Sequence, residues 1–152
     1  MEIFHATIED AECLLELQRV AYQSEAELHN DFNIPPLTQT LDELKADFEK
    51  KIILKVVDNG KLLASGQARL EAGSCHIGRM AVWPELHGQG VGSKLLSSLE
   101  TVFPEANRVE LFTGEFSASN LAMYKRRGYS EFKTAKLGKT RVVFLERNLK
   151  SS

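Results

Sequence analysis

The chain has 152 residues, of which 43% are hydrophobic, and this size fits one domain with a single core. Its 19 basic and 21 acidic residues give a net charge of -2, so neither nucleic acid nor an anionic membrane is favoured as a partner. No apolar run approaches the roughly 18 residues of a membrane helix, and the N-terminus lacks the pattern of a signal peptide. We therefore expect a cytoplasmic protein with a single domain over residues 1–152.

The cysteine and histidine content predicts neither a disulfide framework nor a metal centre. Two cysteines, Cys13 and Cys75, are too few for such a framework, and we expect both to be buried structural thiols. His29, His76 and His87 show no metal-ligand spacing, and no cysteine–histidine cluster accompanies them. The sequence therefore indicates a protein that uses no metal.

The first thirty residues are predicted to form a strand and then helices. The strand is expected over residues 1–8, and a helix begins at Glu9–Asp10, because acidic residues suit the positive end of a helix dipole. Apolar residues then recur at roughly helical spacing, and this pattern weakens over residues 22–30, which favours two helices. The apolar positions are Leu14, Leu17, Ala21 and Leu28.

Residues 29–40 are expected to form a loop. Pro36 disfavours the helical conformation at Pro35, so the segment should not continue a helix. Thr40 then caps a short helix, because Glu43 stands three residues later as its partner in a capping box. The apolar stripe of this helix consists of Leu41, Leu44 and Phe48.

Three strands follow in the middle of the chain. The first covers residues 51–58, and Asn59–Gly60 predicts a type I′ turn, in which both central residues need positive φ. Residues 61–70 then return antiparallel to the first strand. The third strand, residues 75–82, ends before Pro84, which cannot donate a hydrogen bond to a strand ladder.

The last part of the chain alternates between helix and strand. The expected elements are a helix after residues 88–92 that Pro104 stops, a strand over 108–113, a helix over 117–127 that Gly128 closes, and strands over 129–135 and 140–147. The basic run Lys125–Arg127 is typical of a solvated helix end. A strand–helix–strand connection suits parallel neighbours, whereas the hairpins are antiparallel. We therefore expect a mixed, twisted sheet with helices on both faces.

The most informative segment is the glycine-rich turn between the third central strand and the next helix. It reads His87-Gly88-Gln89-Gly90-Val91-Gly92-Ser93. The first turn of a helix leaves N–H groups unpaired and carries partial positive charge, and glycines let an anion approach the backbone. The turn predicts a phosphate or pyrophosphate cradle, although the same spacing also suits a tight turn that binds nothing.

Two common phosphate-binding motifs do not fit this turn. A P-loop needs lysine directly after its second glycine, whereas Ser93 separates Gly92 from Lys94. A dinucleotide fingerprint needs Gly-x-Gly-x-x-Gly in a parallel fold, whereas this turn has Gly-x-Gly-x-Gly after antiparallel hairpins. Glu110 follows at about the distance of the ribose-binding acid in that fingerprint, but it falls within a strand.

Together with a second motif, the turn resembles the coenzyme site of the GNAT superfamily of N-acetyltransferases. The family's Arg/Gln-x-x-Gly-x-Gly/Ala motif appears at residues 87–92, with His87 in place of arginine or glutamine. A late-helix motif appears as Asn120-Leu121-Ala122-Met123-Tyr124 and continues to Gly128-Tyr129. The resemblance covers residues 51–149, and the first fifty residues match loosely. It implies an α/β (α+β) fold with a largely antiparallel, six- to seven-stranded sheet and a central splayed parallel strand pair.

The resemblance also implies acetyl-CoA as the acyl donor. Backbone amides of the glycine turn would hold the pyrophosphate, and the strand ending at Val82 would pair with the pantetheine arm, with one N–H near Val82 polarising the thioester carbonyl. Asn120 and Tyr124 share a helix face, and the Tyr124 hydroxyl would protonate or hydrogen-bond the leaving thiolate. The cofactor-binding residues are then Met80, Ala81, Val82, His87, Gly88, Gln89, Gly90, Val91, Gly92, Ser93, Asn120 and Tyr124.

The acceptor amine must lose a proton before it attacks. Some branches of the family place a carboxylate base eleven positions before the Arg/Gln of the coenzyme motif, and that count reaches His76. Imidazole suits a base near neutral pH, although His76 also fits an ordinary strand histidine. Glu110 and Glu115 are reserve candidates. Direct attack of the amine needs no nucleophilic cysteine, and Cys75 should face the opposite side of its strand.

The favoured hypothesis is acetyl transfer to an amine of a small molecule or peptide. A non-catalytic acyl-CoA-binding sensor and a nucleotide-binding protein are the alternatives. In relatives the first helices and the late hairpin set the acceptor, here residues 22–41 and 136–141, and the acids Glu25, Glu27 and Asp31 could attract a cationic amine. Many relatives dimerise through their last strands. The apolar run 142–145 is compatible with a homodimer and equally with a strand buried within one subunit.

Overall fold

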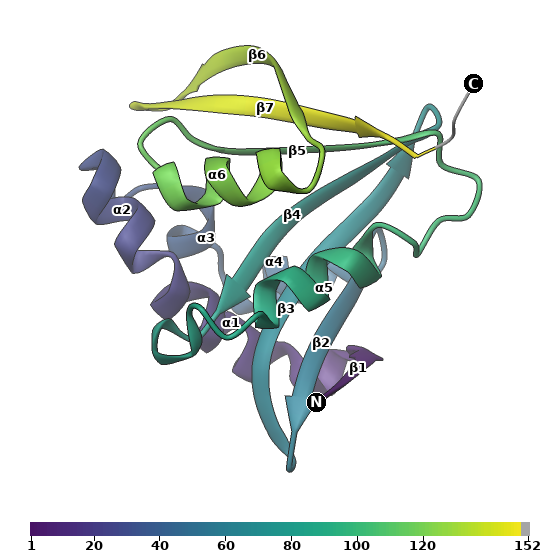
Figure 1. Ribbon diagram of the computed structural model, residues 1–152. Helices are drawn as coiled ribbons and strands as arrows, with labels where there is room; N and C mark the ends of the chain where they lie inside the picture. The colour runs from purple at the N-terminus through teal and green to yellow at the C-terminus, as the bar shows by residue number, and fades with distance from the viewer. Residues whose placement is uncertain (150–152) are drawn as a thin grey trace.

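The computed structural model describes residues 1–149, in which a mixed sheet separates two layers of helices (Figure 1). The seven strands are β1 (Glu2–His5), β2 (Ile52–Asp58), β3 (Lys61–Glu71), β4 (Ser74–Val82), β5 (Arg108–Gly114), β6 (Ser130–Leu137) and β7 (Thr140–Asn148). Their order in the sheet is β1-β2-β3-β4-β5-β7-β6, and only β4 and β5 are parallel neighbours. The predicted mixed sheet with a central parallel pair is confirmed.

Helices cover the sheet from both sides. They are η1 (Ile8–Asp10), α1 (Ala11–Ala21), α2 (Gln23–His29), α3 (Pro35–Thr38), α4 (Leu41–Asp47), η2 (Pro84–Leu86), α5 (Val91–Leu99) and α6 (Ala118–Arg126). The helix α1 packs on α4 and β4, and α5 crosses β2, β3 and β4 on the opposite face. Gly66 permits the close approach of α5, because a Cβ at this position would lie 2.7 Å from Leu99 Cδ1. The early helical segment is divided into α1 and α2, as the weakened pattern predicted.

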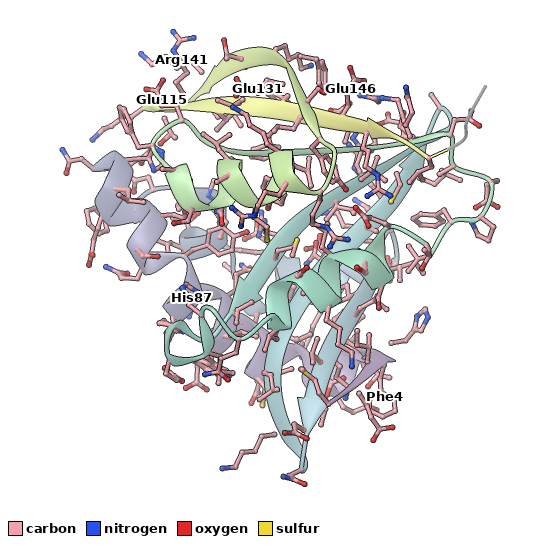
Figure 2. All side chains as sticks on the ribbon, viewed as in Figure 1. Phe4, His87, Glu115, Glu131, Arg141 and Glu146 are labelled. Atoms are coloured by element: carbon pink, nitrogen blue, oxygen red, sulfur yellow. The ribbon has the colours of Figure 1, made fainter. Side chains whose placement is uncertain are left out.

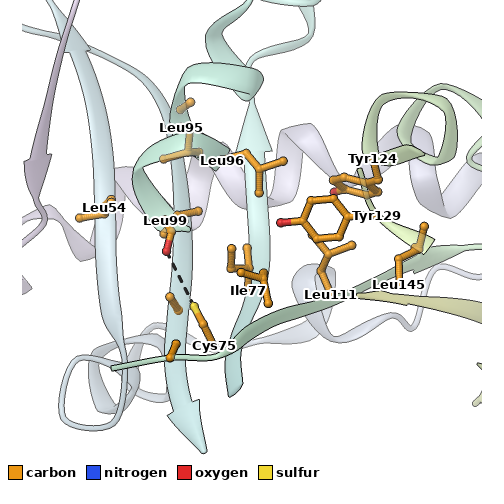
Figure 3. Packing of buried hydrophobic residues seen from close by; sticks show 14 of the residues in the cluster. Leu54, Cys75, Ile77, Leu95, Leu96, Leu99, Leu111, Tyr124, Tyr129 and Leu145 are labelled. Carbon is orange, nitrogen blue, oxygen red and sulfur yellow. Dashed lines mark hydrogen bonds between the residues drawn. The ribbon is translucent and has the colours of Figure 1, made fainter. Parts of the chain in front are cut away.

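Two hydrophobic clusters fill the space on the two faces of the sheet. In the larger one, α5 packs Leu95, Leu96 and Leu99 over the central strands (Figure 3). The smaller one joins α1 and α4 to Ile53 of β2. Ile53 and its neighbour Leu54 enter different clusters because successive side chains of a strand point to opposite faces. Every second residue of a regular central strand therefore faces the same helical layer.

The two thiols lie in different environments, and the prediction that both are buried is wrong for Cys13. Cys13 is exposed because Leu14, Leu17 and Gln18 form the buried side of α1. Cys75 is buried beside α5, with its Sγ 3.8 Å from the carbonyl oxygen of Leu99. Burial raises the pKa of Cys75 to about 11, so this thiol stays protonated at neutral pH.

Residues 35–38 form the single turn α3, whereas the sequence predicted a loop throughout residues 29–40. Ile34 is extended, as the residue before a proline should be. Pro35 and Pro36 then occupy the first positions of the turn, where a missing N–H removes no helical hydrogen bond. The prolines therefore start a helical turn instead of preventing one.

The apolar run 142–145 is accounted for within one chain. β7 lies between β5 and β6, and Val142, Val143 and Leu145 are buried there. Phe144 faces the side of the sheet opposite to Val143 and Leu145, with its ring centroid 5.2 Å from that of Phe112. The homodimer stays a prediction, and this face carries an exposed aromatic side chain, Phe112, which is 50% exposed.

Candidate active site

The parallel strands β4 and β5 are paired at one end only. Within residues 1–149, their pairing ends at His76 and Glu110. β5 then continues along β7 to Gly114, while β4 continues along β3 to Val82. The backbone groups on this side of β4 have no strand partner after His76, so they are available to an extended ligand in the middle of the sheet. The splayed pair implied by the resemblance is present.

A β-bulge interrupts β4 within its unpaired part. Gln67 pairs with Gly78 and Ser65 pairs with Ala81, so Arg79 and Met80 together oppose Gly66. Arg79 has a φ of 52°, a left-handed conformation that is uncommon for a residue with a Cβ. Its guanidinium Nη1 donates a 2.8 Å hydrogen bond to Gln39 Oε1 at the end of α3. The bulge thus turns Arg79 away from α5.

The glycine-rich turn leads from β4 into the first turn of α5. His87 stands on this turn (Figure 2). Gly88 and Gly90 have φ values of 82° and 80°, which other residues rarely adopt, and a Cβ on either would meet nothing within 4 Å. A Cβ on Gly92 would lie 3.6 Å from Val82, so the helix begins directly against the end of β4. The first turn of α5, whose N–H groups lack helical partners, therefore begins beside the unpaired edge of β4, next to the open space at Gly88 and Gly90.

Tyr124 is buried on α6 with a hydroxyl that has no hydrogen-bond partner within residues 1–149. The hydroxyl oxygen keeps some exposure to solvent, so a ligand can reach it. Its ring centroid lies 5.8 Å from that of Tyr129, and both rings join the large core cluster (Figure 3). Burial, and then the charge of Glu25, raise the pKa of Tyr124 to about 12. The phenol is therefore protonated at neutral pH.

A carboxylate from α2 reaches the start of α6. Glu25 Oε2 accepts a short hydrogen bond from the Ser117 hydroxyl, and Glu25 Oε1 lies 3.5 Å from Asn120 Nδ2. The Asn120 amide also donates to Thr113 Oγ1 at 3.3 Å. Burial, and then the charges of Tyr124 and Glu25, raise the pKa of Tyr22. Glu25 thus links the first helices to the helix that carries Tyr124.

Comparison with family models matches residues 13–129 to the acetyltransferase (GNAT) family. The chain belongs to this family. No curated protein sequence gives a significant match.

Solved structures share the GNAT fold over nearly the whole chain. The PaiA N-acetyltransferase of Thermoplasma acidophilum in complex with coenzyme A has a TM-score of 0.82 and 16% identity, over 97% of this chain and 98% of that one. The YncA putative acetyltransferase of Salmonella typhimurium, with its cofactor acetyl-CoA, has a TM-score of 0.76 and 18% identity, over 100% and 95%. The ribosomal-protein-S18-alanine N-acetyltransferase of Escherichia coli has a TM-score of 0.79 and 15% identity, over 99% and 95%.

In this GNAT domain, His76 lies at the point where β4 and β5 separate. Its Nδ1 is 3.6 Å from Glu110 Oε2, and its Nε2 is 3.8 Å from Glu71 Oε2. Burial lowers the pKa of His76, although the charge of Glu110 opposes this effect. Cys75 faces α5 and His76 faces the other side of the sheet, as strand alternation predicted. The imidazole is therefore neutral at neutral pH and can accept a proton.

The two reserve candidates for the base occupy different places. Glu110 pairs with His76 across the strands and is held by Arg108 Nη2 at 3.0 Å. Glu115 lies just after β5 beside Arg141, whose carbonyl oxygen accepts its N–H at 3.0 Å (Figure 2). The structure thus brings Glu110, but not Glu115, together with His76.

Arg127 contradicts the prediction of a solvated basic helix end. Its Nη1 donates to Ser93 Oγ at 3.0 Å, and its Nη2 donates to the buried carboxylate of Glu100 at 3.0 Å. Lys125 and Arg126 are exposed as predicted. Arg127 therefore fixes the end of α6 to α5, from the first turn of that helix to its end. No pattern in the sequence predicts this contact, because residues far apart in the chain form it.

Proposed function

We propose that the chain is an acetyl-CoA-dependent N-acetyltransferase in which an amine attacks the thioester directly. The observation that carries the proposal is the separation of β4 from β5 after His76, with the glycine turn at one end of the unpaired edge. An extended pantetheine arm could pair with the backbone of Met80, Ala81 and Val82 as an added strand. Its pyrophosphate would then meet the unpaired N–H groups between Gly88 and Ser93.

The free hydroxyl of Tyr124 supports a role at the sulfur of the thioester. A thiol has a reference pKa of about 8.5, which is about 3.5 below the pKa of about 12 for Tyr124. Complete transfer of the phenolic proton to the thiolate would therefore be uphill. Tyr124 instead donates a hydrogen bond that stabilises the thiolate as the carbon–sulfur bond breaks, and the thiolate takes its proton from solvent.

The neutral imidazole of His76 supports a role as the base. A protonated amine has no lone pair for attack, so it must give up a proton before or during the new carbon–nitrogen bond. His76 takes this proton directly or through a water molecule. The nitrogen then bonds to the carbonyl carbon and loses its second proton to solvent. The tetrahedral oxyanion collapses as the carbon–sulfur bond breaks, and the amide and the thiolate of CoA are formed.

The acids near the start of α6 favour a cationic acceptor. Glu25 lies on α2 and accepts a hydrogen bond from Ser117 at the start of α6, and its charge adds to the effect of burial in raising the pKa values of Tyr22 and Tyr124. A negative charge here attracts an ammonium group toward the site before deprotonation. Asp31 is less suited to this role, because its carboxylate is buried and accepts a 2.7 Å hydrogen bond from Thr140.

A thiol-release assay with acetyl-CoA tests the proposal against four classes of amine. These are spermidine, tyramine, lysine and a peptide with an N-terminal alanine, the last because two structural neighbours are named as ribosomal-protein-alanine N-acetyltransferases. We expect CoA release above the rate with water for at least one class. Binding of acetyl-CoA by calorimetry without CoA release would favour the non-catalytic sensor. Greater thermal protection by ATP or NAD than by CoA would favour a nucleotide-binding protein.

A further inference from the structure

The side-chain amide of Gln67 is buried without a partner. Gln67 is 4% exposed, its amide makes no hydrogen bond within residues 1–149, and its Oε1 is sealed from solvent. Gln18 is equally buried at 4%, yet its amide donates to Pro36 O at 2.9 Å and to Gln39 Oε1 at 3.0 Å. An unpartnered buried amide lowers stability, so its presence needs a reason other than folding.

Gln67 lies on the face of the sheet that is turned away from α5. Its strand neighbour Gly66 contacts Leu99 of α5, and alternation therefore places Gln67 on the opposite face. It pairs directly with Gly78 of β4, where a Cβ would meet nothing within 4 Å. Because β5 has already separated from β4 at this level, the uncrowded space above Gly78 adjoins the gap between the two strands.

His76 shares this face of the sheet with Gln67. His76 pairs with Arg69, two residues beyond Gln67 on the same side of β3. Diagonal neighbours of this kind have side chains within reach of one small group placed between them, because they are roughly 7–8 Å apart. The proposed base and the unpartnered amide therefore border the same space, on the side of the gap opposite the α5 layer.

We propose that Gln67 positions the acceptor amine for attack, an inference that rests on the proposed acetyltransferase function. Its Oε1 is sealed from solvent but its Nε2 is not, and a half rotation of the side-chain amide exchanges the two. The carbonyl then accepts a hydrogen bond from an N–H of the amine and directs the nitrogen lone pair toward the thioester. An uncharged amide suits this step, because it does not stabilise the ammonium form as a carboxylate would. The ligand supplies the missing hydrogen bond, which explains why the free protein tolerates an unpartnered amide.

The test compares Gln67→Leu with its matched control Gln18→Leu. Urea unfolding without ligand should show that Gln67→Leu is at least as stable as the wild type, whereas Gln18→Leu is less stable because Pro36 and Gln39 lose their partner. With the best amine of the four-member panel, Gln67→Leu should raise the KM for the amine by about tenfold or more, the equivalent of one lost hydrogen bond. The KM for acetyl-CoA should not change, and Gln67→Asn should restore part of the amine affinity.

Several results would overturn the inference. An active Gln67→Leu variant with an unchanged KM for the amine shows that the amide does not contact the acceptor. A loss of stability in Gln67→Leu as large as that in Gln18→Leu shows that the amide has a structural partner. Neither result affects the proposed function. Wild-type protein that releases no CoA with any of the four amines overturns the proposed function together with the inference.

Discussion

The imidazole Nε2 of His29 accepts a 3.0 Å hydrogen bond from the backbone N–H of Phe116 and thereby ties the end of α2 to the segment between β5 and α6. Since Nε2 accepts, the ring proton lies on Nδ1, which is 2.9 Å from the carbonyl oxygen of Glu25. The Phe116 ring stacks on the imidazole with centroids 5.3 Å apart. Gly114 lies against this imidazole, because a Cβ there would overlap the ring. The helices expected to set the acceptor thus have a fixed position relative to Tyr124.

The substitution Gly114→Ala should displace His29 and loosen α2. Its Cβ would lie 2.2 Å from His29 Nε2, so the ring must move and the Phe116 N–H loses its acceptor. We expect the free energy of unfolding to fall by about 1–3 kcal/mol in urea titrations. Gly78→Ala is the matched control, because a Cβ there meets nothing and stability should be preserved. Equal stability of the two variants would contradict the proposed contact.

Tyr124→Phe should lower kcat by roughly 10- to 100-fold, which is the effect of losing one hydrogen bond to a developing charge. The dissociation constant for acetyl-CoA and the unfolding midpoint should stay nearly constant, because the free hydroxyl has no hydrogen-bond partner in the described part of the chain. Tyr129→Phe provides the control, since its hydroxyl donates a 2.6 Å hydrogen bond to buried Glu100. That variant should lose stability and keep its kcat. An unchanged kcat in Tyr124→Phe would remove this residue from the mechanism.

Gly90→Ala should weaken acetyl-CoA binding by about tenfold or more in calorimetry. Its φ of 80° strains a residue with a Cβ, and the methyl group would enter the space where the pyrophosphate is expected. Gly60→Ala is the matched control, because Gly60 has a similar φ of 76° and a Cβ there would also meet no atom within 4 Å. Both variants should lose a similar amount of stability, about 1 kcal/mol. If Gly60→Ala weakens binding as much as Gly90→Ala, strain alone explains the effect.

The pH dependence of kcat/KM for the amine should report on His76. A base works in its deprotonated form, so activity rises as pH increases through the pKa of the base. Because burial lowers the pKa of His76, this acidic limb should lie below the ordinary histidine value of about 6.5. His76→Gln should remove the limb and reduce the rate. A His76→Gln profile that superimposes on the wild type would exclude His76 as the base and turn attention to Glu110.

Elements whose causes lie within a few residues could be predicted from the sequence. Asn59 and Gly60 adopt φ values of 51° and 76°, as the predicted type I′ turn requires. The Thr40–Glu43 capping box forms with hydrogen bonds of 2.8 and 3.2 Å. The end of α5 is less well predicted, because the helix stops at Leu99, well before Pro104. Local chemistry therefore fixes turns and helix starts better than it fixes helix ends.

The parts of the site that depend on distant contacts could not be predicted. The glycine turn and the splayed strand pair could be predicted, because the coenzyme motif resembles that of the GNAT family. The side-chain amide of Gln67 has no hydrogen-bond partner because of how the neighbouring strands and the helices pack around it. The presence of a glutamine in a strand does not predict this arrangement. The acids Glu25 and Asp31 looked equivalent in the sequence, yet only Glu25 reaches α6.

The extra residue at the bulge changes which side chains of β4 meet α5. Before it, Cys75 and Ile77 face that helix, and after it Met80 and Val82 do. The residues of β4 that face α5 therefore have odd numbers before Arg79 and even numbers after it. Deleting Arg79 would restore unbroken alternation and rotate the end of β4 by half a turn, so that Val82 would no longer lie under Gly92. A single extra residue thus decides which side chains of β4 pack beneath the start of α5.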